Sequence, residues 1–309
     1  MKYLVSILSI TLSLFLLEIL TRTIIDNGLN YEIEMLKYAN RLKIISKNKE
    51  IGIEHKKNIS TSLMSVNVTL NSDGFRNNKK IDQNTKKILM LGDSMTFGWG
   101  AQKTFSDVLN EKFEDYQVIN AGIGNTNTSM QIENFFKNFK DLYSYDLIVL
   151  NFFINDFEKV KIVEPNLFEK YSFFYTFLSN TLNKIFIKFN LKEDWNRFYA
   201  SSFKNDKFIK LSLEKIIRLK KYCEKNDIKF IIHNIPELRN LKDYKFQKET
   251  NIIKSFADKN NIVFLNSYEV LENHDEKDLW VTDRDHHAND FAHNIIGGYL
   301  ISKISKMIN

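Results

Sequence analysis

The chain has 309 residues, of which 43% are hydrophobic and 27% charged, and its formal net charge is +6. This composition is typical of a globular protein, and the length suits one α/β domain with an additional segment. Lysines are interleaved with acidic residues and form no basic block, so no nucleic-acid partner is expected. The single cysteine, Cys223, excludes an internal disulfide.

The N-terminus is an apolar stretch from Tyr3 to Leu17, preceded by Lys2. It approaches the roughly 17–25 residues that a membrane-spanning helix needs. Because Glu18–Arg22 is a poor cleavage site, residues 1–25 are expected to form an uncleaved signal anchor; a cleaved signal peptide and a buried helix are the alternatives. The positive-inside rule places the N-terminus in the cytoplasm and the remaining chain in the periplasm or outside the cell.

Residues 26–84 are polar and are predicted to form a stalk followed by an extended piece. A helical pattern covers Tyr31–Ile45, and Ser65–Leu70 has the pattern of a strand. The sequence Asn71-Ser72-Asp73-Gly74 predicts a turn, because Asp-Gly favours positive φ.

From Lys86 onward, apolar strand patterns alternate with helical ones. This alternation predicts a parallel sheet with helices on both faces, within a domain at 85–309. Residues 157–206 are too long for a simple crossover, and we expect a helical insertion that flanks the site. The expected strands are Ile88–Leu91, Gln117–Asn120, Leu147–Phe152, Ile228–His233 and Ile262–Leu265. The expected helices are Phe105–Phe113, Ser129–Leu142, Lys207–Asn226, Phe246–Asn260 and Asn289–Met307.

Ser94 is the candidate nucleophile, because an apolar strand breaks at Gly92-Asp93-Ser94. Open α/β sheets bind ligands at the carboxyl ends of their strands. Acyl transfer by serine needs a base and a group that orients the base. His287, preceded by Asp285, supplies both near the C-terminus.

The same chemistry needs hydrogen-bond donors aimed at the developing oxyanion. The side-chain amide of Asn155, just after the third expected strand, is one candidate. The backbone N–H of Ser94 is a second. A backbone N–H at Gly124 or Asn125, after the second strand, completes the predicted oxyanion hole.

These blocks, in this order, resemble the SGNH or GDSL-type hydrolase superfamily: Gly92-Asp93-Ser94, Asn155-Asp156, and the run from His287 to His293. Asn71–Arg76 resembles a segment found upstream in membrane-anchored bacterial members. The resemblance covers about residues 85–309. It implies a flavodoxin-like three-layer α/β/α fold with a five-stranded parallel sheet, following an N-terminal transmembrane helix.

The resemblance also implies site roles: Ser94 as nucleophile, His287 as general base, and Asn155 with a loop glycine as oxyanion donors. The implied activity is that of an esterase, lipase or carbohydrate deacetylase, without a metal or organic cofactor. The usual final block is Asp-x-x-His, but Arg284 stands three residues before His287, so the spacing here is Asp285-x-His287; Asp285 is the expected partner of His287 and Asp283 is its competitor.

The glycine block also departs from the family pattern. Asn125 stands where the family has glycine, and Gly124 lies one residue earlier. Asparagine tolerates a left-handed backbone, so the N–H at this position could still point into the site.

Other polar residues near these blocks are expected to be structural. Asp93 would bond loop amides, Asp156 would position the loop of Asn155, and His286 and His293 would have no catalytic role. A metal site at the terminal histidines and aspartates is not favoured, because no second liganding cluster accompanies them. Four aromatic residues either belong to the core or line an acyl or sugar site: Phe97, Trp99, Phe152 and Phe153.

We therefore expect hydrolysis of an ester through an acyl-serine intermediate. The substrate would be an acylated small molecule, or a glycan or lipid of the cell envelope. One alternative is O-acyl transfer to or from an envelope polysaccharide, because a membrane anchor would bring such a glycan within reach. The other is a non-catalytic glycan-binding domain on the same fold.

Overall fold

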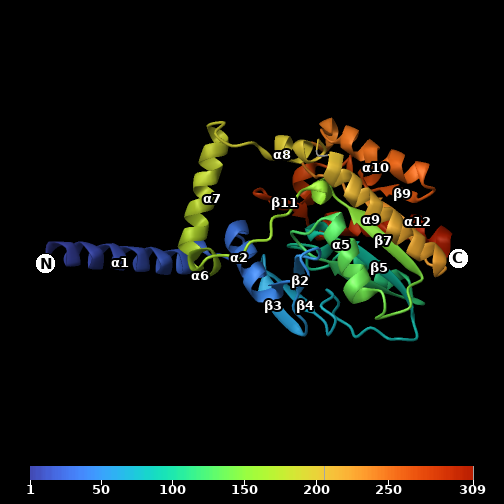
Figure 1. Cartoon of the computed structure of the whole chain (residues 1–309), viewed down its shortest axis with the longest axis horizontal. Coiled ribbons are helices and arrows are strands. Elements are labelled where there is room, and N and C mark those ends of the chain that lie inside the picture. Colours follow the sequence, from blue (N-terminus) through green and yellow to red (C-terminus); the bar gives the residue numbers. More distant parts are fainter. Residues whose placement is uncertain (205, 309) are drawn as a thin grey trace.

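The centre of the molecule is a five-stranded sheet, seen in Figure 1 in a computed structural model that describes residues 1–204 and 206–308. All neighbouring strands are parallel, and their order is β6-β5-β7-β8-β9. This is the strand order of flavodoxin, so the predicted fold class is confirmed. The strands are β5 (Lys86–Gly92), β6 (Tyr116–Gly122), β7 (Leu147–Phe152), β8 (Lys229–Asn234) and β9 (Val263–Asn266).

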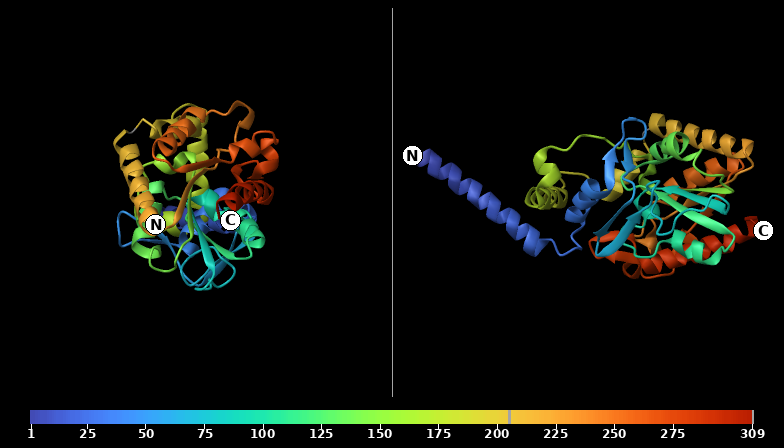
Figure 2. Two further views of the ribbon diagram at one scale, coloured as in Figure 1. Left: turned by 90° about the vertical axis from the view of Figure 1, so that its right-hand side faces the viewer. Right: turned by 90° about the horizontal axis from the view of Figure 1, so that it is seen from below.

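Helices cover both faces of this sheet and make a three-layer structure (Figure 2). Side chains alternate along β5, because successive residues of a strand point to opposite faces. Ile88 and Met90 pack with α4 (Phe105–Lys112) and α12 (Asp290–Ile308). Leu89 and Leu91 lie in the other core. That core also contains residues of α5 (Thr128–Asn134), η2 (Phe135–Phe139), α9 (Asp206–Lys225) and α10 (Gln247–Lys259).

The segment between residues 26 and 84 packs on the sheet domain next to Ser94. It contains α2 (Tyr31–Leu42), which ends earlier than predicted because the following residues pair with a strand. Side chains from this segment form a third core with Phe97 and Trp99. The domain boundary at residue 84 stays a prediction. The strands here are β1 (Lys43–Ile45) with β2 (Ile53–His55), and β3 (Ile59–Leu63) with β4 (Val66–Leu70).

The turn predicted at Asp73-Gly74 is present, with Gly74 at φ 86°. Arg76, two residues later, is buried and donates hydrogen bonds to the carbonyls of Phe97 and Gly98. The upstream segment is therefore bonded to the loop that follows Ser94.

The segment from 157 to 204 contains helices α6 (Leu167–Tyr171), α7 (Phe173–Lys188) and α8 (Trp195–Ser202), separated by irregular stretches. That this segment is an insertion stays a prediction. Asn205, within that prediction, and Asn309 lie outside the described residues. The remaining short elements are η1 (Thr21–Ile25), α3 (Ser94–Phe97), η3 (Ile154–Phe157), η4 (Leu241–Asp243), α11 (Tyr268–Leu271), η5 (Glu276–Leu279), β10 (Trp280–Thr282) and β11 (Asp285–Ala288).

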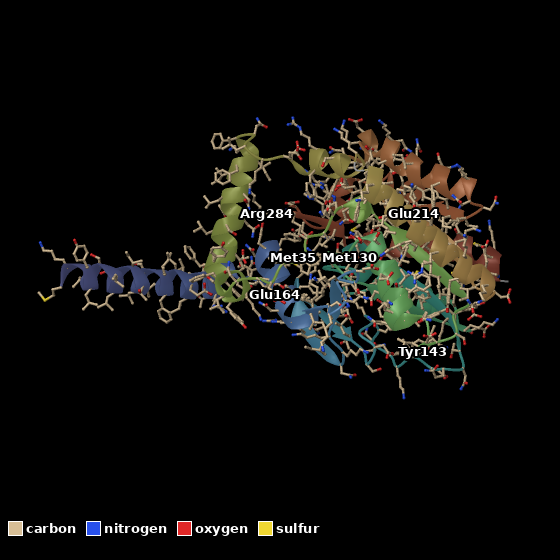
Figure 3. All side chains as sticks on the ribbon, in the orientation of Figure 1. Met35, Met130, Tyr143, Glu164, Glu214 and Arg284 are labelled. Carbon is tan, nitrogen blue, oxygen red and sulfur yellow. The ribbon has the colours of Figure 1, made fainter. Side chains whose placement is uncertain are left out.

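The N-terminal helix α1 (Lys2–Leu20) projects away from the domain, and Figure 3 shows its side chains standing free on all sides. With η1 it forms a continuous apolar helix from Lys2 to Ile25, which is long enough to cross a membrane and almost entirely unburied. A signal sequence has the same length and composition.

Candidate active site

Ser94 lies at the carboxyl edge of the sheet, in a tight turn between β5 and the short helix α3. The Asp93 side chain caps this helix by accepting a hydrogen bond from the Met95 N–H at 2.9 Å. Gly92 is required by close packing, because a Cβ there would lie 2.0 Å from the Thr96 Oγ1. The strand, the glycine and the cap together present the serine hydroxyl at the end of the sheet.

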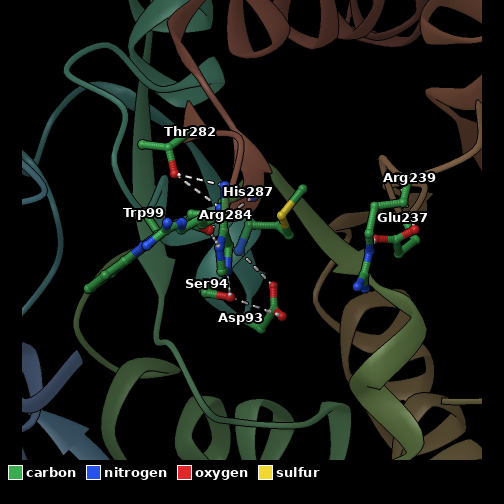
Figure 4. A network of polar contacts seen from close by, with 10 residues as sticks. Asp93, Ser94, Trp99, Glu237, Arg239, Thr282, Arg284 and His287 are labelled. Carbon is green, nitrogen blue, oxygen red and sulfur yellow. Dashed lines mark hydrogen bonds and ion pairs between the residues drawn. The ribbon is translucent and has the colours of Figure 1, made fainter. Parts of the chain in front are cut away.

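The structure brings the three residues predicted for nucleophilic chemistry into one line of hydrogen bonds, of which Figure 4 labels Ser94 and His287. The Ser94 Oγ lies 2.9 Å from the Nε2 of His287, although the two are 193 positions apart in the chain. The Nδ1 of His287 lies 2.6 Å from the Oδ1 of Asp285. Asp285 is the acid that contacts His287, whereas Asp283 is exposed.

The charges of this line keep His287 ready to accept a proton. Burial by itself lowers the pKa of His287, but the carboxylate of Asp285 and its hydrogen bond outweigh burial, and the pKa is raised. Burial by itself raises the pKa of Asp285, but the charge of His287 and the bonds that Asp285 accepts leave it lowered. Because a carboxylate only accepts, Nδ1 carries the proton and Nε2 is free to accept from the serine.

Trp99 holds the second oxygen of Asp285, a contact that sequence analysis missed. Its indole N–H donates to the Oδ2 at 2.7 Å, and both side chains are buried. The ring is also part of the core, as are Phe97, Phe152 and Phe153. Only its position, five residues after Ser94, could have pointed to a role near the site.

Tyr31 is a second neighbour that the sequence did not reveal. Its ring is stacked on His287 with centroids 6.1 Å apart, and it comes from the start of α2. The segment predicted as a stalk therefore contributes a wall of the site.

Gly124 lies beside the nucleophile, but its N–H is already bonded. A Cβ on Gly124 would lie 3.5 Å from the Cβ of Ser94. The Gly124 N–H donates to the hydroxyl of Tyr38 at 2.9 Å. Asn125 has φ 64°, in the left-handed region that asparagine tolerates, and its side chain is exposed.

The Tyr38 hydroxyl is held in turn by His55. The hydroxyl lies 2.7 Å from Nε2 of His55, and Nδ1 lies 3.1 Å from the Gly74 carbonyl. A carbonyl cannot donate, so Nδ1 carries the proton, Nε2 accepts, and Tyr38 donates to it. Burial lowers the pKa of His55 to about 3, so this ring stays neutral. Neither residue was predicted to lie near the site.

Asp93 lies near the other two candidate oxyanion donors. Burial raises the pKa of its carboxyl, while the Met95 N–H that it accepts and the nearby Asn155 amide and Ser94 N–H act to lower it. Asp156 accepts from the Phe153 N–H at 2.7 Å and so fixes the turn that carries Asn155. Asp93 and Asp156 thus have the loop-holding contacts that were expected of them.

His286 and His293 lie outside the hydrogen-bonded line of Ser94, His287 and Asp285. His293 is buried, and its Nδ1 accepts from the Phe105 N–H at 3.1 Å. His286 packs edge-on against Trp280, with ring centroids 4.3 Å apart. In the described part of the chain, no group of three histidine, cysteine or acidic residues is arranged to hold a metal.

No protein-family profile matches the chain, and no curated protein matches it. Solved structures similar to it include an acetyl xylan esterase, at 18% identity over 71% of this chain and 99% of that chain, with a TM-score of 0.45. A member of the lipolytic G-D-S-L family from Veillonella parvula is 14% identical over 72% and 100%, with a TM-score of 0.44. A lipase/acylhydrolase from Enterococcus faecalis is 12% identical over 73% and 98%, with a TM-score of 0.46. Such distant similarity carries no argument about chemistry, so function has to be inferred from the side chains of the site.

Proposed function

We propose that this protein is a serine-dependent ester hydrolase of the SGNH type. The observation that carries the proposal is the continuous line from the Ser94 Oγ through His287 to Asp285, with contacts of 2.9 and 2.6 Å. A nucleophile, a base and a group that orients the base are the arrangement that serine acyl transfer needs.

In the first step, the Ser94 Oγ forms a bond to the ester carbonyl carbon while Nε2 of His287 takes the hydroxyl proton. The tetrahedral intermediate collapses as the ester C–O bond breaks, and His287 returns the proton to the departing alcohol. Water then attacks the acyl-serine, again losing a proton to His287. The carboxylic acid leaves and Ser94 regains its proton.

The oxyanion of each tetrahedral intermediate would be bound by the Ser94 N–H, the Asn155 side-chain amide, and the N–H of Gly124 or Asn125. In the present arrangement the Tyr38 hydroxyl accepts from the Gly124 N–H. A substrate oxyanion would replace Tyr38 as the acceptor of this N–H, because a hydrogen bond to a charged oxygen is stronger than one to a neutral hydroxyl.

The proposed location is the outer face of a membrane. The exposed apolar surface of α1 supports an anchor, and the positive-inside rule puts the sheet domain in the periplasm or outside the cell. A site held there would act on an acylated small molecule, or on an acylated glycan or lipid of the envelope.

Replacing the nucleophile tests this function. We expect Ser94→Ala to lower the hydrolysis of p-nitrophenyl acetate by roughly 10⁴–10⁶-fold, because the acyl-serine cannot form. Ser255→Ala, at an exposed serine of α10, is the matched control and is expected to keep full activity. Unchanged hydrolysis by folded Ser94→Ala would exclude this serine as the nucleophile.

A further inference from the structure

Helix α7 carries a stripe of large apolar side chains on its outer surface, which we call the α7 stripe. Its members are 39–42% exposed and recur at intervals of three and four residues, so they share one helix face. They are Tyr175, Leu178, Leu182, Ile185 and Phe186, and Phe189 continues the stripe at 68% exposure. Contiguous apolar surface of this kind marks an interaction site.

The start of α7 is fixed to the end of α1. The Glu18 carboxylate of α1 accepts hydrogen bonds from the N–H groups of Phe173 and Phe174, both at 3.0 Å, and from the Ser172 hydroxyl at 2.8 Å. The Arg22 guanidinium lies 3.9 Å above the centre of the Phe173 ring. The last turn of α1 is therefore bonded to the first turn of α7.

This polar cluster marks the level at which α1 leaves the hydrocarbon. The 19 residues of α1 rise about 28 Å, close to the ~30 Å hydrocarbon thickness of a bilayer. Charged groups at the end of such a helix belong in the headgroup region. Because Glu18 caps α7, α7 begins at the same level.

The direction of α7 fits the membrane surface. In Figure 1 α7 runs across the direction of α1, between α1 and the sheet domain. In the right view of Figure 2, α7 is seen nearly end-on while α1 extends along its length. A helix that crosses a membrane-spanning helix in this way lies parallel to the bilayer plane.

Lysines lie near the stripe, among acidic residues. Residues 167–194 contain four lysines, together with Glu169, Glu193 and Asp194. Lysine stems can lie on apolar surface while their ammonium groups reach the headgroups. The lysines are Lys170, Lys184, Lys188 and Lys192, and all four are exposed. On the domain side, Lys184 also pairs with Glu32 of α2.

We propose that α7 is an interfacial helix that lies on the lipid bilayer, with the α7 stripe at the boundary between headgroups and acyl chains. Interfacial helices have this combination of an apolar face and flanking lysines. Together, α1 and α7 would attach the protein to the membrane at two points. The sheet domain could then not rotate freely about the axis of α1. Because α7 packs on α2, and Tyr31 of α2 stacks on His287, the edge of the sheet that carries Ser94 is held toward the membrane. This inference rests on the proposed anchor and not on ester hydrolysis.

The test uses the full chain in nanodiscs of phosphatidylcholine and phosphatidylglycerol. A bimane label is placed on Leu182→Cys or Phe186→Cys; Cys223 is buried, so the introduced thiol is the reactive one. We expect both labels to lose most of their emission when doxyl-labelled lipid is included, and to resist quenching by iodide. Two controls are expected to keep their emission with doxyl lipid: Asn180→Cys, on the opposite face of α7, and Ile252→Cys, an exposed apolar position of α10.

A label at Leu12→Cys separates this inference from the anchor itself. Quenching at Leu12 and at the α7 stripe supports the inference. Quenching at Leu12 without quenching at the stripe would overturn it while keeping the anchor. Absence of quenching at both would overturn the anchor and the inference together. Disulfide cross-linking of Leu182→Cys to a second copy would instead assign the stripe to a protein contact, and would also overturn it.

Discussion

The groups on the two sides of Ser94, the base His287 on one and the candidate oxyanion donors on the other, differ in their hydrogen bonding. On the base side, the hydrogen bonds form one continuous line: the Ser94 Oγ donates to His287, and His287 and Trp99 both donate to Asp285. On the oxyanion side, the Gly124 N–H donates to a protein acceptor, the Tyr38 hydroxyl, while the Ser94 N–H and the Asn155 amide lie near the buried carboxyl of Asp93.

We propose from this difference that the base is already oriented, whereas the oxyanion hole forms when the substrate replaces Tyr38 as the acceptor of the Gly124 N–H. Donors that already have partners remain satisfied without substrate, since a buried unpaired N–H costs about 1–3 kcal/mol. The following variants test the two sides in order of expected effect.

The largest effect is expected on the base side, at Asp285. Asp285→Asn removes the charge that orients His287 and should lower kcat/KM by roughly 10³–10⁴-fold. Activity needs neutral His287, so it rises as the pH passes upward through the pKa of this group. Because Asp285 raises that pKa, the acid limb of the pH profile should move to lower pH in the variant. Asp283→Asn is the matched control and should leave rate and profile unchanged; a large effect there would reverse the assignment.

On the oxyanion side, Asn155→Ala should lower kcat by roughly 10²–10³-fold with little change in KM, because the lost donor acts on the transition state. Steady-state kinetics on p-nitrophenyl acetate measures both constants. Asn251→Ala, at an exposed position of α10, is the control. A raised KM with unchanged kcat would instead assign Asn155 to ground-state binding.

Trp99→Phe should lower kcat/KM by about 10–100-fold, the value of one hydrogen bond to a charged group. Loss of the indole donor also raises the pKa of Asp285, which then holds the imidazolium more tightly. The acid limb should therefore move to higher pH. A packing defect alone would lower the rate equally at all pH values. That result would show that Trp99 does not position Asp285.

The smallest effect on rate is expected for Tyr38→Phe. The change leaves the Gly124 N–H and the His55 Nε2 without partners, so the free energy of unfolding should fall by about 1–3 kcal/mol and the melting temperature by several degrees. The kcat should stay within about threefold, because the Gly124 N–H becomes free for the oxyanion. A large loss of kcat at an unchanged melting temperature would mean that the Tyr38 hydroxyl itself serves the reaction.

The sequence predicted the sheet and the approach of Ser94, Asp285 and His287 because these depend on regular patterns. Strand patterns locate the carboxyl edge of the sheet, and residues that follow different strands meet there. The flavodoxin-like strand order is implied by the resemblance to SGNH-type hydrolases, because the alternation of strands and helices alone does not determine it.

The contacts of Trp99, Tyr31 and Tyr38 could not be predicted in the same way. These contacts join the site to the segment between residues 26 and 84. The sequence of this segment has no regular strand or helix alternation from which its place against the sheet domain could be predicted. An aromatic residue in such a segment is equally compatible with a core and with a site wall. Only the three-dimensional packing shows that α2 lies against His287 and Gly124.

Reaction with a fluorophosphonate probe tests the central claim most directly. A competent serine forms a P–O bond to the probe and releases fluoride, which requires both the nucleophile and its base. We predict a single adduct on the full chain, on the peptide that contains Ser94, and its loss in His287→Ala. No adduct on the folded protein, or an adduct at another residue, would contradict the assignment of this site as that of a serine hydrolase.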